Sequence, residues 1–330
     1  MENARHFIGA DLSKRTIDLF YRPSKSHLKI TNSEEGYLLL IKWIKEHRLV
    51  FSELMIVMEH TGLYSACFEK FLHKQSIAFC KVSALEIKKS IGVVRGKTDK
   101  IDAGRIADYA NEKKDKLHPQ KPISKTLERL KLLRSSRELL VKQRAGLKCF
   151  VKEIQNIGTS DKDIILKAHI KTIKAMNEQI ASLENEMEKT INQDEQVTRN
   201  YHLLMSIKGV GKVLAIAVIV KTDNFIRFKN ARKFACFCGT APFEFSSGSS
   251  VRKRTRVSHI ADKSMKTLLE LSARSAIQHN PDIKAYFQRR VAEGKSKMST
   301  LNIIRNKIIY RMFAVIKRQE IHTETYKRAA

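Results

Sequence analysis

The first part of the chain alternates between short strand-like runs and helical stretches, and this order constrains the fold more than any other feature. An apolar run from His6 predicts a strand, and the next two strands form a hairpin that turns near Pro23–Ser26. Helices are expected over Glu34–His47 and Leu63–His73, and strands at LMIVMEHTG and SIAFCKVS. The remainder, to about Lys113, is expected to be mostly helical. The predicted order is therefore βββαβαβα.

This order is that of the ribonuclease-H-like fold, a mixed α/β sheet with helices on its faces. In the first helix, Leu38, Ile41 and either Trp43 or Ile44 recur at helical spacing and are expected to form the buried face. An irregular patch is expected around Gly92–Lys97. We place this α/β domain at residues 1–118.

Pro119 and Pro122 then interrupt the pattern, and a long helical region is expected over Ser124–Ile191. Its apolar residues recur at helical, partly heptad-like spacing: Leu130, Leu133, Leu140, Leu147, Val151, Ile154, Ile173, Met176, Ile180, Leu183 and Met187. This predicts two long helices, as an antiparallel pair or a coiled-coil stalk for dimerisation over residues 119–198. Helices packed on their own domain are the open alternative. Residues 199–330 are expected to form a mostly helical C-terminal domain.

The charge of the chain points to a polyanionic partner. Lys and Arg number 63 against 34 Asp and Glu, a formal net charge of +29. The segment from Pro281 to the end holds 12 Lys or Arg and 4 Asp or Glu. Such an excess repels itself unless a polyanion neutralises it, and nucleic acid is the commonest one. A membrane surface is the alternative, but no apolar run is long enough to span a bilayer.

The five cysteines are scattered and odd in number, which does not suit a disulfide framework. They fit a reducing cytoplasm, where we expect the protein to be associated with the nucleoid. Cys236 and Cys238 form a C-x-C pair without a second pair to complete a zinc site, so we interpret them as ordinary buried thiols.

Four acidic residues occupy positions that favour convergence. Asp11 closes the first strand, Glu59 closes the fourth, and Asp99 and Asp102 lie three apart on the last helix of the α/β domain. Such a cluster would repel itself without a cation, and hard oxygen ligands favour Mg²⁺ or Mn²⁺. Two ions of this kind support phosphodiester chemistry. Solvated surface carboxylates are the alternative, which we retain for the neighbouring acids Asp18, Glu53 and Asp108, as surface or supporting groups.

A glycine pair interrupts the segment SIKGVGKVLAIAVI. This segment is similar to a helix-hairpin-helix element, in which main-chain N–H groups and a helix N-terminus contact phosphate. The residues expected to bind nucleic acid here are Lys208, Gly209, Gly211 and Lys212. A plain connection between two helices explains the segment equally well.

A serine-rich turn, expected at Phe245–Ser250, directly precedes a run of basic residues. Serine is a poor nucleophile until it is activated, and guanidinium groups stabilise the charge that develops on a phosphate. The basic residues expected to contact nucleic acid are Arg252, Lys253, Arg254 and Arg256. A flexible basic loop that grips backbone phosphates is the alternative.

These motifs together resemble the DEDD transposases of bacterial insertion sequences, whose relatives include the Piv-type DNA invertases. The N-terminal blocks that resemble this family are IGADLSK, MEHTGLY and KTDKIDAGRIA. The C-terminal blocks are IKGVGKVLA, RFKNARKFACFCGTAPFEFSSGSSVR and HNPDIKAYFQRRVAEGK. The resemblance covers nearly the whole chain, and several motifs in the same order make it specific.

The resemblance implies a RuvC-like nuclease domain, a helical dimerisation region and a second catalytic domain that carries a serine. The family's four acids correspond to Asp11, Glu59, Asp99 and Asp102, and its serine corresponds best to Ser247, with Ser246 as the less favoured neighbour. The serine would attack DNA and become covalently linked, with the metal site of a partner subunit completing the centre.

The resemblance also implies partners: donor and target double-stranded DNA, a noncoding bridge RNA that pairs with both, and further copies of the chain in a dimer or tetramer. His60 departs from the family pattern, because a small residue usually follows the glutamate. A resolvase-like endonuclease that cuts Holliday junctions without rejoining, and a non-catalytic nucleic-acid-binding protein, are the alternative functions.

Overall fold

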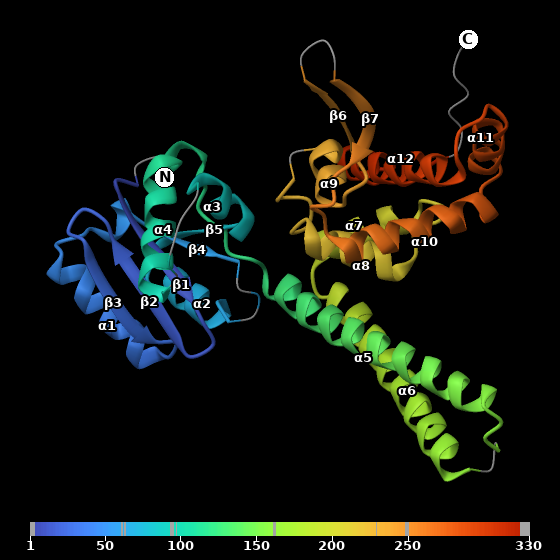
Figure 1. Ribbon diagram of the computed structural model, residues 1–330, viewed down its shortest axis with the longest axis horizontal. Coiled ribbons are helices and arrows are strands. Elements are labelled where there is room, and N and C mark those ends of the chain that lie inside the picture. Colours follow the sequence, from blue (N-terminus) through green and yellow to red (C-terminus); the bar gives the residue numbers. More distant parts are fainter. Residues whose placement is uncertain are drawn as a thin grey trace. The chain divides into compact units, whose positions relative to one another are not determined.

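The computed structural model describes residues 4–60, 62, 64–92, 96, 98–160, 163–228, 230–247 and 251–323, with the main chain alone at 245, 247 and 251–254 (Figure 1). The chain divides into two compact units, Met1–Pro122 and Ile123–Ala330. The first unit ends four residues after the end expected for the α/β domain, residue 118, which stays a prediction. The expected boundary between residues 198 and 199 lies inside the second unit and stays a prediction.

The N-terminal unit is built on a five-stranded mixed sheet of order β3-β2-β1-β4-β5. Strands β1, β2 and β3 are antiparallel neighbours, whereas β4 runs parallel to β1 and β5 runs parallel to β4. The strands are β1 (His6–Leu12), β2 (Thr16–Tyr21), β3 (Ser26–Thr31), β4 (Leu54–Glu59) and β5 (Ala78–Val82). This arrangement is compatible with the ribonuclease-H-like prediction.

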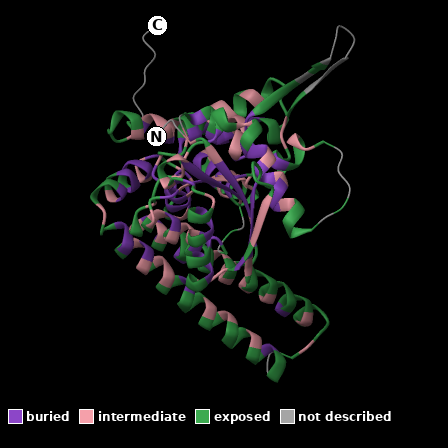
Figure 2. Ribbon diagram, turned by 90° about the vertical axis from the view of Figure 1, so that its left-hand side faces the viewer, coloured by how far each residue is buried: buried purple, intermediate pink, exposed green. Residues whose placement is uncertain are grey.

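Helices cover both faces of the sheet, because each face is apolar. One face packs on α1 (Glu34–Glu46) and α2 (Ala66–Lys74), and the other packs on α3 (Ala84–Ser90) and α4 (Asp99–Glu112). Figure 2 shows the strands as the buried centre of this unit. Short 3₁₀ turns precede β4 at Phe51–Glu53 and follow α4 at Lys114–Lys116.

The buried face of α1 differs from the expectation. Leu38 is 63% exposed, and the helix instead buries Tyr37 and Leu40, together with Trp43 and Ile44. The ring of Tyr37 packs against aromatic rings of α2, at 5.3 Å from Phe68 and 5.0 Å from Phe71 between centroids. This long-range contact sets the rotation of α1, and spacing alone did not reveal it.

The second unit begins with the two long helices that the apolar spacing predicts, α5 (Lys125–Asn156) and α6 (Ile164–Ile191). They run antiparallel against each other and are joined at their far ends by a short connection (Figure 1). Polar pairs link them, including Arg137 to Glu184 at 2.6 Å and Arg144 to Asn177 at 2.6 Å. The seam is buried mainly at the end of the pair that joins the C-terminal core.

The remaining helices form the core of the second unit: α7 (Glu195–Met205), α8 (Lys212–Lys221), α9 (Ala231–Phe237), α10 (Lys263–His279), α11 (Pro281–Ala292) and α12 (Lys297–Arg318). Helix α8 is the most apolar and is buried from Leu214 to Val220. Across the described part of the chain, no helix has both the length and the apolar character needed to cross a membrane.

The basic segment in this unit forms regular structure that the sequence pattern did not predict. Strands β6 (Pro242–Ser247) and β7 (Val251–Val257) pair as an antiparallel ribbon. The sequence predicted only a polar turn here, within a mostly helical domain, and missed the two strands that flank it. Cross-strand pairing brings the two halves of the segment together, whereas neither half has a continuous strand pattern of its own.

Candidate active site

Two of the predicted acids lie at the carboxyl ends of neighbouring parallel strands. In the β1–β4 ladder, Ala10 pairs with Met58, which puts Asp11 and Glu59 at the same edge of the sheet. Both residues are half-buried. Because the apolar residues before them anchor the strands in the core, the strands hold these two carboxylates in place.

Helix α4 brings the other two acids to the same face of the sheet. It begins after Thr98, whose hydroxyl accepts a hydrogen bond from the Ile101 N–H at 3.2 Å. Asp99 and Asp102 lie in its first turn, where the helix dipole favours negative charge. Asp99 is exposed and Asp102 is half-buried.

A glycine in β1 sets how closely α4 approaches the sheet. A Cβ atom at Gly9 would lie 2.2 Å from the carbonyl oxygen of Ala103 and 2.3 Å from the amide nitrogen of Ala107. No side chain fits in that space, so the helix backbone rests directly on the strand. Since Gly9 precedes Asp11 by two residues, the same face of β1 carries the close contact and the carboxylate.

The charges of these acids act on one another. The pKa of Asp11 is raised from 3.8 to about 6, and burial of the carboxyl is the largest cause. Nearby negative charges contribute the rest, in decreasing order those of Asp102, Asp99, Glu59 and Asp18. The fold therefore brings all four predicted acids within electrostatic reach of a common centre at Asp11.

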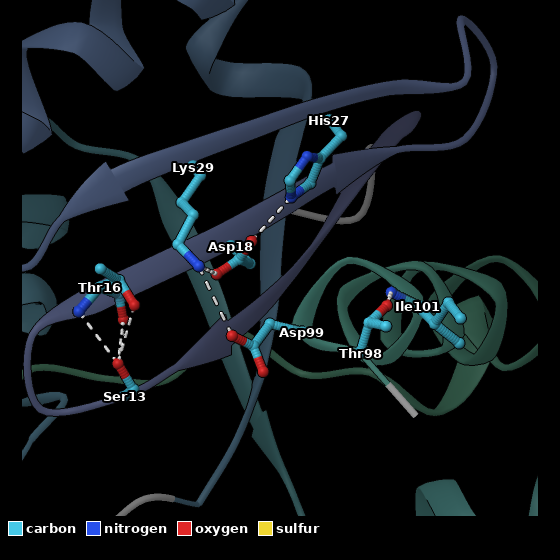
Figure 3. A network of polar contacts seen from close by, with 8 residues as sticks. All are labelled: Ser13, Thr16, Asp18, His27, Lys29, Thr98, Asp99 and Ile101. Atoms are coloured by element: carbon cyan, nitrogen blue, oxygen red, sulfur yellow. Dashed lines mark hydrogen bonds and ion pairs between the residues drawn. The ribbon is translucent and has the colours of Figure 1, made fainter. Parts of the chain in front are cut away.

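Asp18 belongs to this cluster, because its charge also acts on Asp11. We expected Asp18 to be a surface or supporting acid, but its side chain is more buried than that. It is only 3% exposed and pairs directly with Asp11 in the β1–β2 ladder. His27 Nε2 lies 2.8 Å from one of its carboxylate oxygens, and Lys29 Nζ lies 3.5 Å from the other (Figure 3). The sequence signal was the alternation of β2, in which Asp18 and Phe20 share a face.

Basic side chains also neutralise the acids of α4. Lys29 Nζ lies 3.6 Å from Asp99 Oδ2 and so bridges Asp18 and Asp99 (Figure 3). Arg105 Nη1 donates to Asp102 Oδ1 at 2.8 Å, and its other terminal nitrogen donates to the Gly96 carbonyl at 3.0 Å. The Lys29 contact depends on how α4 is seated on the sheet, whereas Asp102 and Arg105 lie three residues apart on the same helix and pair locally.

The donor set suits a hard divalent cation in chemistry, since it consists of carboxylates whose mutual repulsion a cation would relieve. Within the described ranges, however, no three His, Cys, Asp or Glu side chains lie close enough together to hold one ion. The raised pKa of Asp11 reflects burial first and repulsion by the other acids second, and neither requires common contact with one ion. The four acids therefore suit a divalent cation by their chemistry, and their described side chains are not gathered around one position.

The other acids near the cluster form surface ion pairs, as expected. Asp108 binds the Arg22 guanidinium through both of its oxygens, and Glu53 lies 3.8 Å from Arg5. His60 donates its main-chain N–H to the Val82 carbonyl at 3.2 Å and has an exposed side chain. Its backbone therefore extends the pairing between β4 and β5.

The predicted serine lies at the end of the β6–β7 ribbon. Ser247 is the last residue of β6 and pairs with Val251, and Ser246 pairs with Arg252. The side chains of Ser247, Arg252, Lys253 and Arg254, and all of Gly248, lie outside the described residues. The exposed Arg256 pairs with Phe243 at the base of the ribbon.

The base of the ribbon is anchored to α9. Arg232 donates to the Pro242 carbonyl at 2.9 Å and its guanidinium carbon lies 5.6 Å from the centre of the Phe243 ring. Gly239 precedes the ribbon and has a φ of +65°. A Cβ atom at Gly239 would lie 2.4 Å from the Cβ atom of Ala261. This close approach fixes where the chain leaves the helical core.

One glycine of the pair between α7 and α8, Gly209, has a clear packing role. Gly209 has a φ of +93°, and a Cβ atom there would lie 2.8 Å from the Ser272 carbonyl oxygen of α10. The Ser272 hydroxyl donates to the Gly209 carbonyl at 2.6 Å, and Lys212 forms an ion pair with Glu188. These contacts account for Gly209, whereas a Cβ atom at Gly211 would meet nothing within 4 Å. Nucleic-acid binding at Lys208, Gly209, Gly211 and Lys212 stays a prediction.

The cysteines are all free thiols. Cys238 is buried and Cys236 is partly buried, in agreement with their interpretation as ordinary core residues. Burial raises the pKa of the Cys238 thiol, which keeps it protonated and unreactive.

Comparison with known proteins identifies two family models along the chain. The model for DEDD transposases of the IS110 type, described as a transposase, matches residues 8–154. The model described as the transposase IS116/IS110/IS902 family matches residues 201–288. The first match contains the four acids, and the second contains the serine ribbon and most of α11.

Curated relatives agree with these models. The pilin gene-inverting proteins of Moraxella bovis and Moraxella lacunata are each 26% identical over 328 residues, which are 95% of this chain and 96% of theirs. An IS110 insertion-element protein of Streptomyces coelicolor is 25% identical over 160 residues, 48% of this chain and 38% of that protein. The chain belongs to the IS110-type transposase family and is a DNA recombination enzyme.

Proposed function

We propose that this enzyme breaks and rejoins DNA by combining a divalent-metal carboxylate site with a serine nucleophile. The observation that carries the metal site is the raised pKa of Asp11, to about 6, at the centre of the predicted acids. A group placed among like charges at the end of a strand is poised for a cation. The similarity to DNA-inverting and transposase proteins supports a reaction that rejoins DNA as well as cutting it.

The carboxylates would hold Mg²⁺ or Mn²⁺, with Asp11 and Glu59 on the rigid strand ends and Asp99 and Asp102 on α4. When bound, such a metal activates an attacking oxygen and stabilises the charge on a leaving oxygen. The strand ends fix the position of the first two carboxylates. The first turn of α4 supplies the others, at present neutralised by Lys29 and Arg105.

Ser247 is the proposed nucleophile, with Ser246 as the neighbour to be excluded. Its Oγ would form an ester with the phosphorus of the DNA backbone while the bond from phosphorus to one deoxyribose oxygen breaks. The proton leaves the serine, and the departing oxygen receives one. Attack by a second DNA end on this ester reverses the step, so rejoining needs no external energy source. The basic residues of β7 would hold the phosphate.

The serine assignment is tested by a pair of neighbouring substitutions. Ser247→Ala is expected to abolish strand exchange and the covalent protein–DNA adduct, and to leave DNA binding largely intact. Ser246→Ala is the matched control and is expected to keep both activities. Full recombination by Ser247→Ala would refute the assignment. Cleavage without an adduct or a rejoined product, in the unchanged chain, would favour the alternative of a resolvase-like endonuclease.

We further propose that a noncoding bridge RNA guides the enzyme to donor and target DNA, within a dimer or tetramer. The net charge of +29 supports a large nucleic-acid partner, although it does not distinguish RNA from DNA. RNA transcribed from the DNA beside the gene is expected to restore recombination to ribonuclease-treated protein. Full recombination by RNA-free protein would exclude the guide.

A further inference from the structure

A cavity of about 540 Å³ lies in the second unit, between α11 and α12. These helices pack against each other (Figure 1), and together they line the cavity with Asp282, Ile283, Ala285, Tyr286, Arg289, Lys307 and Arg311. The part of the cavity on α11 belongs to the motif HNPDIKAYFQRRVAEGK, to which neither the metal site nor the serine ribbon assigns a role. All of these lining residues are described.

The lining is strongly basic and surrounds one aromatic ring. The lining includes three cationic residues, Arg289, Lys307 and Arg311, and one acidic residue, Asp282. Lys307 Nζ lies 3.8 Å from the centre of the Tyr286 ring, and the Arg289 guanidinium carbon lies 5.6 Å from it. Arg289 also pairs with Glu293 at 3.7 Å, but both side chains are largely exposed, so this contact is weak. A basic, partly apolar hollow of this kind suits an anion attached to a flat ring.

We infer that this cavity binds one unpaired nucleotide of a nucleic-acid strand. Lys307 and Arg311 would hold its phosphate, and its base would lie against Tyr286 over the apolar floor that Ile283 provides. A nucleotide inside a duplex is stacked on both sides and cannot enter a cavity, whereas a single strand can turn a base outward. This inference extends the proposed function and does not depend on it, because binding requires neither the carboxylates nor Ser247.

The contact between Lys307 and Tyr286 does not prevent this binding. A cation over an exposed aromatic ring is held more weakly than a cation that donates hydrogen bonds to a charged partner. The Lys307 side chain is exposed, so a phosphate can compete with the ring for its ammonium group.

The test uses the full chain and three fluorescent probes in anisotropy titrations: oligothymidylate, oligouridylate and a blunt DNA duplex with the same number of phosphates. Tyr286→Ala is expected to weaken binding of the single strands about tenfold, since stacking on an aromatic side chain is worth about 1–3 kcal/mol per base. Binding of the duplex should change less than about twofold. Tyr310→Ala removes a half-exposed tyrosine from α12 outside the cavity, and it should change neither.

A second pair of variants tests the phosphate contact. Lys307→Met is expected to reduce the salt dependence of single-strand binding by about 0.7 in log–log slope. Lys317→Met removes the same charge from the same helix outside the cavity and should leave the slope unchanged. A larger reduction in affinity for one single strand than for the other identifies DNA or RNA as the ligand, and equal reductions mean that both bind.

Tyr286 also packs against the core, so Tyr286→Phe keeps the ring and is expected to bind single strands normally. Melting curves of all variants separate unfolding from weakened binding. Unchanged single-strand binding by a folded Tyr286→Ala would overturn the inference. Equal weakening on single strands and duplex, or equal slopes for the two lysine variants, would overturn it as well.

Discussion

Asp11 of β1 lies directly opposite Asp18 of β2 in the antiparallel ladder, so the two carboxylates share the face of the sheet that α4 covers. Asp18 is buried and is matched by His27 and Lys29. The charges that act on Asp11 are instead those of other carboxylates, and its pKa is raised by burial first and by these charges second. Because basic residues balance the charge of Asp18 but not that of Asp11, the negative potential is concentrated at Asp11, at the end of β1.

Substitution of Asp11 should make the metal-free protein more stable at neutral pH. Because the pKa of Asp11 is raised to about 6 in the folded protein, from 3.8, folding favours its protonated form. The contribution of Asp11 to wild-type stability therefore falls as the pH rises from about 4 to about 6, and the fall is complete above that range. In urea unfolding with chelator present, the free energy of unfolding of Asp11→Asn should exceed that of the wild type by an amount that grows as the pH rises.

The exposed Asp115 provides the control for this measurement. Asp115→Asn should follow the wild-type pH profile throughout. A constant difference between Asp11→Asn and wild type at all pH values would show that Asp11 is not under electrostatic stress.

Divalent metal should stabilise the folded enzyme through the four acids. A ligand at about a hundred times its Kd adds about 2.7 kcal/mol to the free energy of unfolding. Melting curves should therefore shift upward with Mn²⁺ in the wild type and in Glu53→Gln, whose carboxylate lies apart in an ion pair with Arg5. Asp11→Asn and Asp102→Asn should lose the shift and the metal-dependent activity, and equal shifts in all variants would exclude this site.

The close packing of α4 on β1 should not tolerate a side chain at Gly9. Gly9→Ala places a Cβ atom 2.2 Å from a main-chain oxygen, so the helix must move away. We expect the free energy of unfolding to fall by about 3 kcal/mol or more, at the upper end of overpacking effects. Activity should fall too, because Asp99 and Asp102 move with the helix.

Gly104→Ala is the matched control on the same helix, since its Cβ would lie 3.9 Å from the Phe20 ring. We expect it to be neutral or to stabilise by about 0.5–1 kcal/mol, as alanine favours a helix interior. A Gly9→Ala variant as stable as Gly104→Ala in urea unfolding would contradict the packing that the structure shows.

Lys29 should compete with metal for the carboxylates. Its ammonium group lies 3.5 Å from Asp18 and 3.6 Å from Asp99, with a side chain 51% exposed. Lys29→Met is expected to raise Mn²⁺ affinity in a calorimetric titration and to cost less than about 1 kcal/mol of metal-free stability. The exposed Lys42 of α1 serves as the control, and Lys42→Met should change neither quantity. Weaker metal binding by Lys29→Met would mean that the lysine positions the acids instead.

The basic strand β7 should contribute to DNA binding through charge. Replacement of Arg252, Lys253 and Arg254 by glutamine is expected to weaken duplex binding and to reduce its salt slope by about 0.9 for each phosphate that the protein no longer neutralises. Replacement of three lysines of α6, Lys167, Lys171 and Lys174, is the control for total charge. A slope that the β7 variant leaves unchanged would mean that these residues do not touch phosphate.

Much of the first unit followed from local patterns in the sequence. Apolar runs located β1, β4 and β5, and the polar turn after Tyr21 located the β2–β3 hairpin. Asp11 and Glu59 were recognisable because each acid ends an apolar strand. Helical spacing likewise located α5 and α6, and the predicted apolar residues that they bury are Leu130, Leu133, Val151, Ile180 and Met187.

What tertiary structure decided was the environment of those residues. Sequence spacing could not show that Tyr37 rotates α1, that Asp18 is buried, or that Lys29 bridges two acids. It also missed the β6–β7 ribbon. Periodicity and polarity act over a few residues and determine which elements form and where their acids lie. Burial, charge compensation and pKa depend on partners distant in the chain, so only the packed sheet and helices determined them.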